Sequence, residues 1–219
     1  MFSGTLLMRI HQRKTAMVIN CLRRELLIRN LEFLHSACVA SEQLLLDAAG
    51  VADSLPRTPF NKKLSEYYHS HFEEEKGEIS ILVEDLAWAG VPPPPPCEFA
   101  MGMIGTQYYL IKHVHPSALL GYMAVQEADP TPLEVVEKFE RLHGKDLFRF
   151  LRLHAIKDLE HRKELLYLID DTPLQLHDLI TQSAENSLCY YAAAINTWHV
   201  PDQNSVPIGE RPVPEFAIS

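Results

Sequence analysis

Apolar residues recur at helical spacing along most of the chain, and proline or glycine interrupts the pattern. From residue 17 to 49 the apolar positions return every three or four residues, which predicts an amphipathic helix capped by Gly50. A second helix is expected from Asn61 to Ala89, where Gly90 stops it. No segment shows the alternation of apolar and polar residues that a strand requires. The pattern therefore predicts an all-α protein.

Prolines mark the remaining boundaries. Residues 92–96 form an unbroken proline run, which fits a stiff extended connector or, alternatively, a ligand for an aromatic groove. Thr131-Pro132 and Thr172-Pro173 each have the order of a helix N-cap followed by proline. Five more helices are expected, at 98–114, 115–128, 131–142, 146–169 and 172–198.

These boundaries predict a single compact seven-helix bundle that covers residues 17–199. Residues 1–16 are expected to be a frayed N-terminal extension, with Met17 as an alternative start. Four prolines fall within residues 200–219, so this segment is expected to be an irregular tail.

Composition narrows the functional classes. The chain has 20 Lys and Arg against 29 Asp and Glu, a formal net charge of −9, and no basic cluster. Binding to nucleic acid or to an anionic membrane surface is therefore not expected. No apolar run reaches the length of a membrane span. Four scattered cysteines without a CxxC pair favour a reducing compartment, so we expect a cytoplasmic protein.

Histidines and acids share one face of the helix expected at 146–169. His154, Asp158 and His161 are spaced i, i+4 and i+7, which places them within roughly 60° of one another. The same face carries apolar residues and should point inward. Two imidazoles and a carboxylate in such a place need partners, and a divalent metal satisfies all three together. The alternative is a partly exposed helix with a simple His–Asp pair.

A second acidic stripe lies in the helix expected at 61–89. His71, Glu75 and Glu78 fall on one stripe, with Glu74 at its edge, and apolar residues flank this stripe rather than lie opposite it. A solvated acidic face is the alternative interpretation of these glutamates. Glu127 ends an almost uncharged helix, either as a ligand or as a solvated terminal residue.

Together these segments offer four carboxylates and two imidazoles. The predicted metal ligands are Glu75, Glu78, Glu127, His154, Asp158 and His161. Such a mixed oxygen and nitrogen set fits a carboxylate-bridged di-iron or di-manganese site in a helical bundle, and it fits zinc or copper poorly.

The segments YYHSHFEEEKGEISILVEDLAWAG, LLGYMAVQE and HAIKDLEH, in this order, resemble the heme-oxygenase-like di-metal oxidases and oxygenases. The resemblance covers about Tyr67 to His161. It implies a heme-oxygenase-like fold, two Fe(II) ions or manganese in their place, and ligands at Glu75, Glu127, His154, Asp158 and His161. The family has a histidine at the position of Glu78. We therefore favour Glu78 as a substitute ligand and keep His71 or Glu74 as alternatives.

The resemblance also implies an activity. Members of the family use O2 as a co-substrate to oxidise or fragment small carboxylates, often in natural-product biosynthesis, and many are homodimers that need an external electron donor. We expect a free amino acid or a derivative as the substrate, because polar Gln107, His113, Ser183 and Asn186 lie near aromatic residues in the sequence. Tyr190, Tyr191 and Trp198 either pack in the core or form an aromatic wall for that substrate.

Two other functions stay open from sequence. One is a metal-free member of the same fold, either a cofactorless oxidase or a thiaminase-like hydrolase, for which Cys189 would be the candidate nucleophile. The other is a non-enzymatic helical protein whose acidic face binds a partner. Iron content separates both from a di-iron enzyme.

Overall fold

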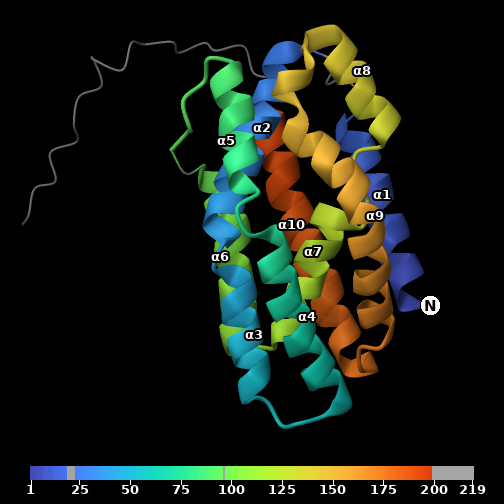
Figure 1. The fold of residues 1–219 in the computed structure, drawn as a ribbon. Helices are drawn as coiled ribbons and strands as arrows, with labels where there is room; N and C mark the ends of the chain where they lie inside the picture. The colour runs from blue at the N-terminus through green and yellow to red at the C-terminus, as the bar shows by residue number, and fades with distance from the viewer. Residues whose placement is uncertain (19–22, 96, 199–219) are drawn as a thin grey trace, which may run out of the picture.

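The chain folds into helices joined by short connections, with no strand in the described parts of the chain. The structure is a computed structural model that describes residues 1–18, 23–95 and 97–198 (Figure 1). The α-helices found there are α1 (Phe2–Val18), α2 (Arg24–Ser41), α3 (Leu44–Ser54), α4 (Pro59–Glu75), α5 (Ile79–Trp88), α6 (Glu98–His113), α7 (Leu119–Glu127), α8 (Leu133–His143), α9 (Arg149–Asp170) and α10 (His177–Trp198). The predicted all-α bundle is confirmed.

Two of the expected long helices are each broken into two. The first divides near Glu42 and Gln43 into α2 and α3, and Gly50 lies inside α3 rather than at its end. The second divides into α4 and α5 at Gly77, whose φ is +88°. This left-handed conformation suits glycine and turns the chain between the two helices. The two breaks and α1 account for the difference between the seven expected helices and the ten α-helices found in the described residues.

The first 18 residues belong to the bundle, contrary to the expected frayed extension. Helix α1 lies along α9 and α10 at one side of the molecule (Figure 1). Leu6 and Ile10, one turn apart on α1, are buried. The Ser3 hydroxyl and backbone N–H both donate to the carboxylate of Asp170 at the end of α9. The apolar stripe of α1 therefore has a partner surface, which the sequence pattern alone did not reveal.

The two threonines expected as N-caps have other roles. Pro132, not Thr131, precedes α8, and no side chain caps that helix. The Thr172 hydroxyl donates to the carbonyl of Leu168, one turn back on α9. Helix α8 thus begins after the extended Pro132, whereas Pro173 precedes a 3-10 turn, Leu174–Leu176, that leads into α10. The expected tail over 200–219 lies outside the described residues.

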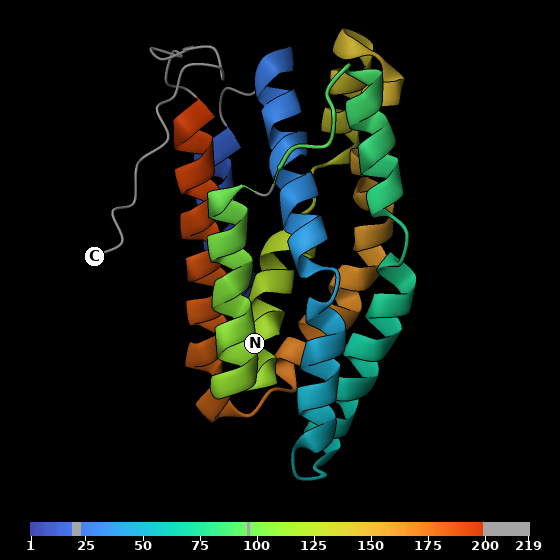
Figure 2. The ribbon, with the colours of Figure 1, turned by 90° about the vertical axis from the view of Figure 1, so that its left-hand side faces the viewer.

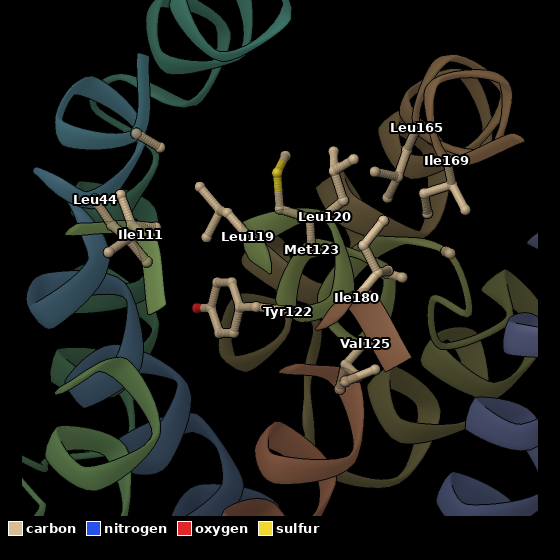
Figure 3. Close-up of a cluster of buried hydrophobic side chains, with 14 of the residues drawn as sticks. Leu44, Ile111, Leu119, Leu120, Tyr122, Met123, Val125, Leu165, Ile169 and Ile180 are labelled. Carbon is tan, nitrogen blue, oxygen red and sulfur yellow. The ribbon is translucent and has the colours of Figure 1, made fainter. Parts of the chain in front are cut away.

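Helix α7 lies at the centre of the bundle. Seven consecutive residues, Leu119 to Val125, are buried, as expected of a helix that is surrounded on all sides. Figure 3 shows its Leu119, Leu120 and Met123 between side chains of other helices: Leu44 and Ile111 on one side, Leu165, Ile169 and Ile180 on the other. A Cβ at Gly121 would lie 2.1 Å from the Ile180 carbonyl oxygen, so glycine is needed for α7 and α10 to approach so closely.

A buried carboxylate fixes the start of α9. Asp85 of α5 is fully buried, and its two oxygens accept hydrogen bonds from the Phe150 backbone N–H and the Arg149 guanidinium. The first turn of α9 is thereby capped from a neighbouring helix. Helices α4 and α5 follow one another along one side of the bundle, as the rotated view shows (Figure 2). Within the described ranges, no helix is long and apolar enough to cross a membrane.

Candidate metal centre

Three helices bring the predicted ligands together. Helix α4 ends at Glu75 and the turn after it carries Glu78, while α7 ends at Glu127. Helix α9 presents the other three, at i, i+4 and i+7: His154, Asp158 and His161. Ion-pair distances below 4 Å link these six side chains: His154 lies near Glu78 and Asp158, and His161 lies near Glu75 and Glu127. The structure therefore assembles all six at one place, although their role as ligands stays a prediction.

The first donor group is His71, Glu74 and His161, with Glu127 beside it. Ligand-type atoms of the three named residues all lie within 4.8 Å of one another. The His161 Nε2 atom lies 3.1 Å from Glu74 Oε2, and the His71 Nε2 atom lies 3.2 Å from Glu127 Oε1. His71 and Glu74, the two alternatives from sequence, are thus part of the cluster in addition to the predicted set.

The second donor group is Glu75, Glu78 and His154, with Asp158 beside it. Its ligand-type atoms also lie within 4.8 Å of one another. The His154 Nε2 atom lies 3.2 Å from Glu78 Oε2, and its Nδ1 atom lies 3.1 Å from Asp158 Oδ1. A carboxylate on one ring nitrogen fixes the imidazole orientation and leaves the other nitrogen for a ligand.

Several buried atoms of these residues have no hydrogen-bond partner. Among the described residues, seven buried side-chain nitrogen or oxygen atoms are unpaired, and five belong to this cluster. The five are His71 Nε2, Glu78 Oε2, Glu127 Oε2, His154 Nε2 and His161 Nδ1. Buried polar atoms without a hydrogen bond are costly, so five of them side by side, within ion-pair distance of one another, make this cluster a candidate ligand site. Since both imidazole nitrogen and carboxylate oxygen are represented, the set fits a divalent transition metal.

The charges in the cluster perturb the pKa values of its members. Burial lowers the pKa of His154, but the carboxylates of Asp158 and Glu78 outweigh it and raise that pKa to about 10. Burial raises the pKa of Glu78, but the adjacent His154 and Lys157 outweigh it and lower that pKa to about 2. Burial and the nearby Glu78 raise the pKa of Glu75. Without a metal, a proton on His154 thus helps to balance the carboxylates.

Lys157 completes the cluster, and the sequence analysis did not identify it. Its ammonium donates to Glu75 Oε1 at 3.0 Å and to Glu78 Oε1 at 2.6 Å. It also donates to the backbone carbonyl of Glu74 at 2.8 Å. The only signal in the sequence is its position one residue before Asp158, and a lysine there usually reaches into solvent.

A cavity of about 250 Å³ adjoins the cluster. Its wall includes His71, Glu75, Glu78, Glu127, His154 and Asp158. The opposite part is largely apolar and contains Phe33, Met123 and Tyr122. Tyr191 also lines it, stacks on Phe33 and donates to Asn30, so one of the three aromatic residues of α10 does form part of a wall. The cluster of carboxylates and imidazoles therefore faces a pocket that could admit a small molecule.

The polar residues expected to contact the substrate lie elsewhere. Gln107 of α6 and Ser183 and Ser187 of α10 hydrogen-bond to one another between the two helices. His113 is exposed and packs on Tyr109. Gln107 and Ser183 therefore join two helices, and none of the four expected residues, Asn186 included, lines the cavity. One polar residue that does line it, Lys14, comes from α1, the segment that was expected to be frayed.

Cysteine chemistry finds little support in the geometry. Cys189 is exposed on α10 and lies outside the cavity wall formed by the described residues. Cys38 does line the cavity, but burial, and then the carboxylates of Glu75 and Glu78, raise its thiol pKa to about 12. A thiol of that pKa is a poor nucleophile at neutral pH. The hydrolase alternative therefore lacks a suitable residue here.

Comparison with known proteins supports the fold. No protein-family model and no curated protein sequence matches the chain. A crystal structure of a domain of unknown function from Shewanella denitrificans OS217, described as having a heme oxygenase-like fold, superposes with a TM-score of 0.67. The alignment covers 89% of this chain and 90% of that one, at 17% identity. The chain has a heme oxygenase-like fold. At this identity the heme oxygenase-like neighbour supports the architecture only, so function must be argued from the site.

Removing single donors should change the metal content. We expect the wild-type protein to bind two ferrous ions, His154→Ala and Glu78→Ala to lose the ion of the second donor group, and His71→Ala to lose the other. Exposed Glu73 on the same helix as Glu75 is the control position, and Glu73→Ala should keep both ions. Iron per chain, measured after anaerobic loading and desalting, checks this. Two ions retained in His154→Ala would show that His154 is not a ligand.

Metal binding should release protons. A metal ligates neutral imidazole, whereas the carboxylates around His154 raise its pKa in the metal-free protein from 6.5 to about 10. Binding near pH 7.5 must therefore displace the proton of His154, and apparent affinity should rise as the pH rises toward 10. Calorimetry with Mn(II) in buffers of different ionisation enthalpy measures the released protons. Equal heats in all buffers would show that His154 is not a ligand or is already neutral.

Proposed function

We propose that the protein is an O2-dependent non-heme oxidoreductase with two iron ions, and that it oxidises or fragments a small carboxylate, such as a free amino acid. The observation that carries this proposal is the set of five buried atoms without a hydrogen bond, from α4, α7, α9 and the turn after α4, beside a cavity. Manganese would fit the same donor types.

Different residues of the chain would bind the metal ions, orient a ligand and limit the access of water. His71, Glu127 and His161 would hold one ion, and Glu78 and His154 the other, with Glu75 between them. Two ferrous ions, when bound, supply the electrons with which O2 is activated. Asp158 keeps the imidazole of His154 oriented through its Nδ1 atom. The apolar wall around Phe33 and Met123 limits the access of water, which protects a reactive site.

Lys14 supports the carboxylate part of the proposal. Its ammonium lines the cavity and donates to the backbone carbonyls of Val125, at 3.2 Å, and Asp129. Burial lowers its pKa, so the charged form lacks full compensation. A substrate carboxylate in the cavity would supply the missing negative charge. In this arrangement the substrate's acid end lies toward α1 and the rest of it lies toward the metal cluster.

O2 consumption by the iron-loaded protein tests the proposal. We expect O2 uptake to accelerate in the presence of the correct carboxylate, with an oxidised or shortened product detectable by mass spectrometry. Free amino acids and medium-chain fatty acids are the two substrate panels, with an added chemical reductant as the external electron donor. Lys14→Met should raise KM for the carboxylate roughly tenfold or more, because a charged hydrogen bond is lost, and should leave the iron content unchanged.

Two results would contradict the proposal in different ways. A protein that holds two irons yet shows no substrate-dependent O2 uptake with either panel would argue for a different use of the metals. If only fatty acids accelerate O2 uptake, the proposed oxidase activity stands but the proposed substrate class is wrong. Exposed Lys163 on α9 provides the matched control, since Lys163→Met should change neither KM nor metal content.

A further inference from the structure

A lysine is built into the most acidic part of the cluster. The Lys157 side chain is only 23% exposed and lies between Glu75 and Glu78. Its third contact, to the Glu74 carbonyl, ties the ammonium to the end of α4. An ammonium in this position is a cation that cannot dissociate from the site, unlike a metal ion.

The charge count of the cluster explains why such a cation is needed. Five carboxylates surround the imidazoles: Glu74, Glu75, Glu78, Glu127 and Asp158. With Lys157 charged and the ligating imidazoles neutral, the cluster carries four negative charges, which two divalent cations neutralise. Without Lys157 it would carry one uncompensated negative charge in a largely buried place, which is costly.

We propose that Lys157 is a positioning residue that acts as the permanent counterion of Glu75 and Glu78 and so allows the second donor group to bind a divalent ion. This inference rests on the proposed function, because it assumes that the cluster holds metal. Lys157 and Glu78 together act as a neutral ligand: the carboxylate supplies the donor atom and the ammonium cancels its charge.

The geometry favours compensation over competition between Lys157 and the metal. Lys157 engages the Oε1 atom of Glu78, whereas Oε2 is buried without a hydrogen-bond partner, 3.2 Å from His154 Nε2. The two oxygens of one carboxylate thus have separate partners. A metal can bind between Glu78 Oε2 and His154 Nε2 while the ammonium keeps its place on Oε1.

Titration with Mn(II), followed by the EPR signal of the free ion, tests the inference without any enzymatic assay. In Lys157→Met we expect the dissociation constant of the second ion to rise roughly ten- to a hundredfold, as is usual when a partner of a ligand is removed. The first ion should keep its affinity. Lys157→Arg should retain most of the binding, since it keeps the charge, and Lys163→Met is the matched control on the exposed face of α9.

A double-mutant cycle with Glu78→His separates charge compensation from a general structural role. With a neutral imidazole at position 78 the ammonium has less to compensate, so Lys157→Met should then weaken the second ion much less. Thermal unfolding of each metal-free variant shows whether the fold is intact. The inference about Lys157 would be overturned, and the proposed function left intact, by any of three results. These are an equal loss of affinity for the second ion in the wild-type and Glu78→His backgrounds, an unchanged dissociation constant of that ion in Lys157→Met, or tighter binding in Lys157→Met. Wild-type protein that binds no Mn(II) would overturn both this inference and the proposed function.

Discussion

The cost of burying charge is the constraint on which this structure depends. Carboxylates and imidazoles from α4, α7 and α9 lie close together in a largely buried place, where charge is costly unless it is compensated. Lys157 compensates part of the negative charge of the cluster, and a proton on His154 compensates another part. Five atoms of the cluster form no hydrogen bond. In the proposed function, divalent cations supply the remaining positive charge. The need for a cationic partner links the fold to its proposed chemistry.

The surrounding architecture serves to hold that cluster. Helix α7 is short and buried on all sides, and its one acid, Glu127, lies at its end, where α4 and α9 are both in reach. The left-handed Gly77 ends α4 early enough for Glu78 to turn back toward His154. Asp85 fixes the first turn of α9, and with it the register of the three ligand-type residues that follow. The buried α7, the turn at Gly77 and the cap by Asp85 are each local features, yet together they set the relative positions of donor atoms from three helices.

Sequence patterns predicted a large part of the site, for physical reasons. The i, i+4, i+7 spacing of His154, Asp158 and His161 is a property of one helix and needs no tertiary knowledge. The helix breaks and the packing of α1 were missed, because an apolar stripe does not show whether a partner surface exists. Lys157 was missed for a similar reason: a lysine among helix residues is normally solvated, and only the approach of α4 buries it. Gln107 and Ser183 were misjudged because polar residues between helices satisfy one another as readily as they bind a ligand.

The heme oxygenase-like fold does not decide the reaction, so the central question is whether the cluster binds metal ions and at which atoms. The most direct measurement is an anomalous difference map from crystals grown with Mn(II) or anaerobic Fe(II). The account predicts two peaks in the cluster, one bonded to His71, Glu127 and His161 and the other to Glu78 Oε2 and His154 Nε2, with Lys157 still on Glu78 Oε1. A map without peaks there, in which ordered waters satisfy the five atoms, would contradict it.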